Sequence, residues 1–318
     1  MIAAYAARFA DDAVSGLEVG ERPAPTARDG WSVVDVRAAA LNHHDLWSLR
    51  GVGLRPEQLP MILGTDAAGV TADGREVVLH GVIGGPSGRG VDADEPRSLL
   101  SERYDGTLAE QVAVPTWNLV DKPPELSFAE AACLPTAWLT AYRMLFTAGG
   151  ATPGQRVLVQ GAGGGLATAA ILLGAAAGLE VVVTSRSSAR RERALTLGAA
   201  AAVEPGARVP RVELVLESVG RATWSHSVRS VRPGGTIVVA GATSGDASPA
   251  ELTRIFFTEL TVRGVTMGSR DDLQHLLAFL ARTGVRPLVD STFPLTDARG
   301  ALGRLAEGEQ FGKIVVEP

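Results

Sequence analysis

A cluster of glycines at residues 161–165 carries the clearest chemical signal in this chain of 318 residues. It follows an apolar stretch, "RVLVQ", and precedes an alanine- and leucine-rich segment. Glycine at the end of a buried strand lets backbone N–H groups approach a diphosphate, and the helix that follows turns its positive end toward the same charge. A plain strand-to-helix turn is the alternative. The residues predicted to bind a dinucleotide pyrophosphate are Gly161, Gly163, Gly164, Gly165 and Leu166.

The end of the next predicted strand distinguishes between two dinucleotides. An acidic residue there would bind a ribose 2′-hydroxyl, but Ser185 and Arg186 follow "VVVT" instead. A hydroxyl and a guanidinium suit a 2′-phosphate, because arginine can bind it through a bidentate charged contact. We therefore predict NADP(H) as the cofactor. The alternative for the arginines that follow, Arg190, Arg191 and Arg193, is a solvated helix face.

The elements around these residues alternate between strand and helix, which predicts a doubly wound parallel sheet. Continuous apolar strands separated by helices of about 10–15 residues are typical of that fold. The expected strands cover residues 155–160, 179–185, 212–218 and 234–241, and the expected helices cover 165–178, 187–198 and 221–231.

The first ~120 residues read as β-rich. Strands are expected at 31–41, at 67–81 with an Asp73-Gly74 turn, and at 106–115, and residues 81–98 are expected to form a long functional loop. Ser127 and Glu130 form a capping box for a helix interrupted near Pro135. A helix at 271–284, the segment 288–295, another helix and a last strand at 312–318 make a C-terminal segment that could rejoin the first part.

Composition limits the possible functions. Hydrophobic residues make up 46% and charged residues 20%, as in an ordinary soluble globular protein. With a net charge of −5, the chain has no excess of basic residues that would indicate binding to nucleic acid or to an anionic membrane. No apolar run has the ~18–20 residues of a membrane span, and no signal peptide is evident. A single cysteine, Cys133, excludes a disulfide within the chain and a cysteine-built zinc site. A cytoplasmic location is expected.

The motifs and their order resemble the medium-chain dehydrogenase/reductase superfamily, and within it the zinc-free quinone oxidoreductase-like branch. The resemblance implies an α/β fold with a GroES-like β-rich domain at 1–122, completed by 265–318, and a Rossmann doubly wound parallel-sheet domain at 123–264. It implies that the nicotinamide lies in the cleft between them and that the protein is a homodimer. The segments that carry it are 40–51, 63–70, 105–115, 126–145, 161–167, 217–224 and 311–318.

The resemblance also implies site residues. Asn42 and Thr140 would be the catalytic residues beside the nicotinamide and substrate; a satisfied helix hydroxyl is the alternative for Thr140. Lys313, with Phe311, would close the cofactor channel; a solvated surface amine is the alternative. Further cofactor contacts implied by the family are Ser218, Val219, Gly241, Ala242, Thr243, Met267, Gly268 and Ser269.

Departures from the zinc enzymes of the superfamily indicate a site without metal. Those enzymes carry cysteine where Asn42 stands and Gly-His-Glu where residues 64–66 read Gly-Thr-Asp. His43 and His44 are adjacent, so their side chains diverge and seldom share one ion. The region after Asn42 also lacks the tyrosine that some enoyl reductases of the superfamily use as a proton donor.

Together these observations predict an NADPH-dependent oxidoreductase that passes hydride to a small electrophile, a quinone or an α,β-unsaturated carbonyl. An NADP-dependent alcohol dehydrogenase with displaced metal ligands is one alternative. A low-turnover NADPH-binding protein with a structural or RNA-binding role is another, which the acidic pI of 5.6 opposes.

Overall fold

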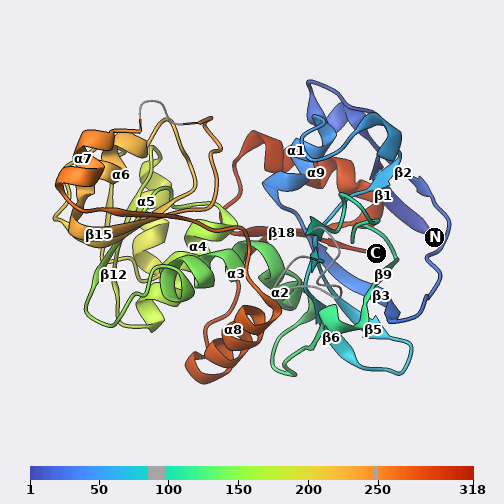
Figure 1. Ribbon diagram of the computed structural model, residues 1–318. Coiled ribbons are helices and arrows are strands. Elements are labelled where there is room, and N and C mark those ends of the chain that lie inside the picture. The colour runs from blue at the N-terminus through green and yellow to red at the C-terminus, as the bar shows by residue number, and fades with distance from the viewer. Residues whose placement is uncertain (85–96, 247–249) are drawn as a thin grey trace. The chain divides into compact units, whose positions relative to one another are not determined.

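Figure 1 shows the computed structural model of the chain, which describes residues 1–84, 97–246 and 250–318. The described chain forms two compact units. The first comprises Met1–Thr136, Ser269–Ala278 and Arg286–Pro318, and the second comprises Ala137–Gly268 and Phe279–Val285. The expected boundary after residue 122 therefore lies inside the first unit, and part of the expected C-terminal segment lies in the second.

The first unit is built mainly on two sheets. Its larger sheet has the order β10-β6-β5-β3-β18-β17, and β9 also pairs with β3. The C-terminal strand β18 pairs antiparallel with β3, so the chain end belongs to this unit. The strands are β3 Trp31–Ala40, β5 Asp66–Thr71, β6 Glu76–Leu79, β9 Gln111–Pro115, β10 Leu119–Asp121, β17 Val289–Pro294 and β18 Lys313–Glu317. The smaller sheet contains β2 Leu17–Glu21, β1 Ile2–Ala6 and β4 Met61–Ile62.

Helices and short turns complete the first unit around an aliphatic core that includes Leu17, Leu49, Leu63 and Leu302. The helices are α1 His43–Leu49, α2 Phe128–Ala132 and α9 Ala298–Glu307. The 3₁₀ turns are Ala13–Gly16, Pro56–Gln58, Thr116–Asn118 and Leu295–Asp297. The expected hairpin is confirmed: β5 and β6 pair antiparallel around Gly74, whose φ is +87°.

The second unit contains the expected doubly wound sheet, with all neighbouring strands parallel in the order β13-β12-β11-β14-β15-β16. This confirms the α/β fold class. The strands are β11 Arg156–Val159, β12 Glu180–Thr184, β13 Ala201–Val203, β14 Val212–Glu217, β15 Val231–Val239 and β16 Thr261–Gly264. The helices are α3 Leu139–Tyr142, α4 Gly165–Ala176, α5 Ser188–Thr196, α6 Trp224–Ser230 and α7 Leu252–Phe257. Helix α8, Arg270–Thr283, contributes residues to both units.

The helical run after Ser127 differs from the expectation of one interrupted helix. Ser127 does cap α2, and its hydroxyl accepts from Glu130 N. The run then passes through two π-helical turns, Leu134–Trp138 and Arg143–Thr147, on either side of α3. A single π turn lets a helix absorb an extra residue without ending, so Pro135 is accommodated inside the run.

Residues 81–98 were expected to form a long loop. At its ends the short strands β7 Val82–Ile83 and β8 Ser98–Leu99 pair antiparallel, while residues 85–96 lie outside the described residues. The strand expected at 106–115 is shorter than its sequence range, since only β9 is extended. Among the described residues, no helix combines the length and apolar character that crossing a membrane needs.

Candidate functional site

The glycine cluster joins β11 to α4 in the second unit. Gly161 has a φ of +101°, which side chains on L-residues rarely tolerate. Gly164 is the N-cap of α4, so the first N–H groups of the helix have no partner within it. A Cβ on Gly163 would lie 3.0 Å from both Cδ and Nε of Arg190. The loop thus places the N-terminal end of α4 near a guanidinium, an arrangement that fits a diphosphate.

A buried network of side chains holds this loop in place. Thr184 Oγ1 accepts from Gly161 N at 3.1 Å and donates to Gln160 Oε1 at 2.9 Å. Gln160 Nε2 lies 3.0 Å from His226 Nδ1 and 2.9 Å from Ser227 Oγ. Because an amide nitrogen only donates, Nδ1 of this histidine must accept. This network was not predicted from the sequence, although a glutamine at the end of an apolar strand was its available signal.

The strand-end residues Ser185 and Arg186 have different surroundings. Ser185 is half-buried and its hydroxyl accepts from Ser187 N at 3.3 Å, whereas Arg186 is exposed. The side chain of Arg191 is held by contacts within the protein. Its guanidinium donates to the carbonyl of Ser185 at 2.7 Å and pairs with Glu204 at 3.3 Å. Arg190 is half-buried beside Gly163. Arg190 is thus only partly solvated, because the first turn of α5 places its side chain beside the glycine loop.

The predicted contacts after β14 are held by a buried carboxylate. Glu217, fully buried, accepts from Val219 N at 2.8 Å and from Gly220 N at 3.0 Å. The hydroxyls of Thr223 and Ser227 also donate to it. These bonds fix the backbone at Ser218 and Val219 at the carboxyl end of the parallel sheet, where open α/β sheets bind their ligands.

The loop after β15 packs against the loop after β14. Thr243 N donates to Ser218 O at 3.3 Å, and Ser244 N donates to Val219 O at 2.7 Å. A Cβ on Gly220 would lie 2.5 Å from the carbonyl oxygen of Gly245. The predicted residues Gly241, Ala242 and Thr243 thus share the same edge of the sheet with the residues after β14.

Four other predicted residues lie near the positions in the sequence where one unit ends and the other begins. Thr140 is 6% exposed on α3, and Met267 is buried with a φ of +50°. These two and Gly268 belong to the second unit, whereas Ser269 belongs to the first. Ser269 and Asp272 exchange side-chain-to-backbone hydrogen bonds of 3.0 and 2.9 Å at the start of α8. Ser269 therefore has a structural role at the start of α8, in addition to the cofactor contact that was expected from the sequence.

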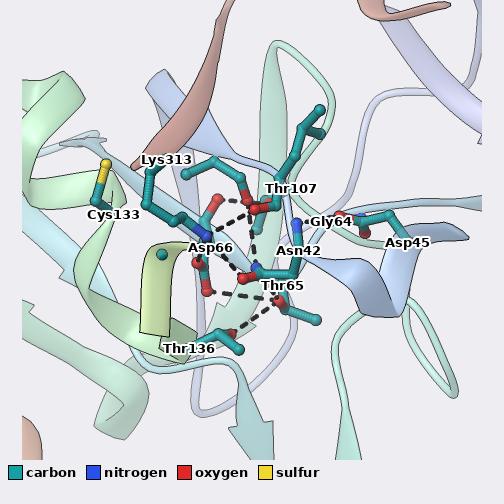
Figure 2. A network of polar contacts seen from close by, with 12 residues as sticks. Asn42, Asp45, Gly64, Thr65, Asp66, Thr107, Cys133, Thr136 and Lys313 are labelled. Carbon is teal, nitrogen blue, oxygen red and sulfur yellow. Dashed lines mark hydrogen bonds and ion pairs between the residues drawn. The ribbon is translucent and has the colours of Figure 1, made fainter. Parts of the chain in front are cut away.

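Asn42 lies in a polar cluster of the first unit, shown in Figure 2. It is 8% exposed and forms the N-cap of α1 in a capping box with Asp45. The Asp45 carboxylate accepts from Asn42 N at 2.8 Å and from Gly64 N at 3.0 Å. Burial raises the pKa of Asp45, and the hydrogen bond from Asn42 opposes that shift. The Asp45 carboxylate therefore fixes the backbone at Asn42 and at Gly64.

The side chain of Asn42 contacts residues far apart in the sequence. Asn42 Nδ2 lies 3.2 Å from Thr65 Oγ1, which lies 3.1 Å from Thr136 Oγ1 (Figure 2). Thr65 is 1% exposed, while Thr136 is half-buried. Asn42 thus begins a short chain of amide and hydroxyl groups that leads toward solvent at Thr136.

Lys313 is the charged member of the cluster. It is 3% exposed, and its Nζ donates to Leu41 O at 2.7 Å, to Asn42 Oδ1 at 2.7 Å and to Asp66 Oδ2 at 3.0 Å. The alternative of a solvated surface amine is therefore wrong. The three contacts use all three hydrogens of the ammonium, so its effect on a ligand would pass through its partners. Phe311 is also buried.

The side chains at this cluster do not fit a zinc ion. Zinc takes thiolate, imidazole or carboxylate ligands. Asn42, Thr65 and Thr136 offer an amide and two hydroxyls, and the carboxylate of Asp66 is paired with the Lys313 ammonium. Burial raises the pKa of Cys133 to about 12, so this thiol stays protonated at neutral pH. Within the described ranges, no three His, Cys, Asp or Glu side chains are grouped as metal ligands.

Two family models match the chain. The model described as an alcohol dehydrogenase GroES-like domain matches residues 28–124, and the model described as a zinc-binding dehydrogenase matches residues 165–282. The first contains the Asn42 cluster apart from Thr136 and Lys313, and the second begins within the glycine loop.

Individual proteins match over nearly the whole chain. A zinc-type alcohol dehydrogenase-like protein of Schizosaccharomyces pombe is 29% identical, with 91% of each chain covered. An acryloyl-coenzyme A reductase of Sulfurisphaera tokodaii is 26% identical, covering 95% of this chain and 97% of the relative. The crystal structure of an NAD-dependent alcohol dehydrogenase superposes with a TM-score of 0.91 at 31% identity over the full length of both chains. The two matched domains, in this order and with this fold, place the chain in the medium-chain dehydrogenase/reductase superfamily of oxidoreductases, to which it belongs.

Proposed function

We propose that this protein is an NADP(H)-dependent oxidoreductase of the zinc-free branch that reduces a quinone or an α,β-unsaturated carbonyl. The observation that carries the proposal is the cluster of Asn42, Thr65 and Lys313, where the zinc enzymes of the resemblance have metal ligands. An amide and a hydroxyl cannot activate an alcohol as a metal does, but they can hold a carbonyl oxygen by hydrogen bonds. The name of the acryloyl-coenzyme A reductase relative describes reduction of such a conjugated system.

In this proposal each unit has its own task. The glycine loop, Arg190 and the loops after β14 and β15 bind the dinucleotide, which supplies a hydride when bound. Asn42 is the substrate-binding residue, and Thr140 contributes to the same reaction as a positioning group. The names of two alcohol dehydrogenase-like relatives support the second candidate, oxidation of an alcohol.

A panel of acceptors separates the candidates. NADPH oxidation would be followed by absorbance with benzoquinones, enones and enoyl thioesters, and NADP⁺ reduction with primary and secondary alcohols, using protein whose metal content has been measured. We expect turnover with a conjugated acceptor at a zinc content far below one per chain. Alcohol oxidation that depends on one zinc per chain would contradict the proposal, and turnover with none of these compounds would favour the non-enzymatic alternative.

The preference for NADPH over NADH is expected to depend on Arg186 and Arg190. Replacing either by alanine should weaken NADPH binding by about 1.5–3 kcal/mol, because a charged hydrogen bond is lost, and Arg186→Ala should leave NADH binding nearly unchanged. Fluorescence titration with both dinucleotides measures this. Arg282→Ala, an exposed arginine of the same unit, is the matched control. Equal affinity of the parent protein for NADH and NADPH would contradict the assignment.

We also propose that the protein is a homodimer joined through the second unit. Strand β16 lies at the edge of the parallel sheet with all four residues exposed. Helix α7 beside it in the sequence leaves large apolar side chains in solvent, with Phe256 64% and Phe257 74% exposed. An edge strand next to exposed apolar surface is a common pairing site. Light scattering of the parent and of Phe257→Asp, which should be monomeric, tests this proposal.

A further inference from the structure

The ammonium of Lys313 determines the orientation of the Asn42 amide. Lys313 Nζ lies 2.7 Å from one end of that amide. An ammonium has hydrogens but no lone pair, so the atom facing it must be the carbonyl oxygen Oδ1. The amide nitrogen Nδ2 therefore points away from Lys313, toward Thr65, as drawn in Figure 2. The hydrogen-bond chemistry alone fixes the orientation of this side chain.

The two hydrogens of Asn42 Nδ2 are held only loosely. One is donated to Thr65 Oγ1 at 3.2 Å, and the other contact is to the carbonyl of Ala40 at 3.4 Å, which is long for an N–H···O bond. Lys313 withdraws electron density through Oδ1, and such polarisation strengthens the donor at the other end of an amide. Asn42 is thus a donor that can exchange a weak bond to the protein for a stronger bond to a ligand.

The charged pair at the centre of the cluster is not available to take a proton from a substrate. Lys313 is an ammonium with all its hydrogens donated, and its charge is balanced by Asp66, which is fully buried. The Asp66 carboxylate also faces Thr65 Oγ1 at 3.4 Å. With both charges of the pair engaged, Asn42 is the member of the cluster that can donate to an oxygen that carries negative charge.

We infer that Lys313 is a positioning residue, which holds Asn42 as a hydrogen-bond donor to an oxygen that becomes negative during the reaction. The inference rests on the proposed function and narrows it to reduction of acceptors in which a carbonyl is conjugated to the carbon that receives hydride. Hydride adds to the β-carbon, and the electron pair of the C=C bond shifts to leave an enolate oxygen. Asn42 Nδ2–H donates to that oxygen, and water then protonates the α-carbon and restores the carbonyl.

The first test uses binding and needs no turnover. The chain has only two asparagines, Asn42 and Asn118, so ¹⁵N-asparagine labelling shows two side-chain amide nitrogens, each with one pair of signals, and Asn42→Asp assigns them. The probe is 4-nitrophenolate, a stable mimic of an enolate oxygen, added to protein saturated with NADP⁺. We expect the Asn42 signal to move downfield while the signal of the buried Asn118 stays in place. No movement of the Asn42 signal, whether or not the probe binds, would overturn the inference even if the protein reduces enones.

The second test is kinetic and compares variants of matched shape. Asn42→Asp keeps a partner for Lys313 but replaces the N–H donor by an oxygen, so kcat for an enone should fall at least tenfold further than in Asn42→Ala, with NADPH affinity within about threefold of the parent. Lys313→Arg keeps a donor facing Oδ1 and should retain most of kcat. Lys313→Gln can present an oxygen that allows the amide to turn, and should lose kcat rather than raise KM. Equal kcat in Asn42→Asp and Asn42→Ala, or in the Arg and Gln variants, would contradict the donor role.

Discussion

Replacing Lys313 by methionine should lower the free energy of unfolding by about 3–5 kcal/mol. Methionine fills a similar volume but leaves the Asp66 carboxylate, which has no exposed surface, without its opposite charge. Removing one partner of a buried ion pair typically costs this much, because the remaining charge stays desolvated. Urea unfolding followed by tryptophan fluorescence, at a fixed protein concentration and without cofactor, measures the change.

The control for this prediction removes both charges. In the double variant Lys313→Met, Asp66→Asn, the side chain at position 66 keeps its size and an oxygen for Thr65, so no buried charge is left unpaired. We expect this variant to be more stable than Lys313→Met alone. If the double variant is as unstable as the sum of the two single variants, Lys313 and Asp66 are not coupled, and the loss in Lys313→Met arises from packing.

The fold was largely predictable, because its signals are local and repeated. Apolar strands with intervening helices predicted β11, β12, β14 and β15, and Gly161 marked the turn into α4. The two edge strands of the sheet, β13 and β16, were missed for physical reasons. Strand β13 is only three residues long, and alanine is depleted in strands, so its sequence does not indicate one. Strand β16 is exposed at every position and lacks the apolar run that predicts a buried strand.

The site was predictable only in part, because its contacts are not local. Asn42 and Lys313 are 271 positions apart, so no spacing in the sequence could pair them. The buried state of Lys313 follows from the pairing of β18 with β3, which brings the last strand beside the start of α1. Arg190 illustrates a related limit of sequence-based prediction. Helical periodicity predicts only a polar position there, whereas in the structure the first turn of α5 directs the side chain toward Gly163.

Replacing Glu217 by alanine should destabilise the second unit by about 3–5 kcal/mol and weaken NADPH binding at least tenfold. The carboxylate is the shared acceptor for Val219 N, Gly220 N and the hydroxyls of Thr223 and Ser227. Each buried donor left without an acceptor costs about 1–3 kcal/mol, less what local relaxation recovers. The loop after β14 would lose its fixed backbone, and with it the proposed contacts of Ser218 and Val219 to the cofactor.

Glu217→Gln separates this shared-acceptor role from simple packing. Glutamine keeps one oxygen, which can still accept from the two backbone N–H groups, and its amide nitrogen faces hydroxyls that can rotate to accept. We therefore expect it to lose about 1–2 kcal/mol and to bind NADPH within a few-fold of the parent. Urea unfolding and NADPH titration of both variants provide the comparison. If glutamine and alanine are equally damaging, negative charge rather than hydrogen-bond acceptance is what this position supplies, and the loop is held electrostatically by its N–H dipoles.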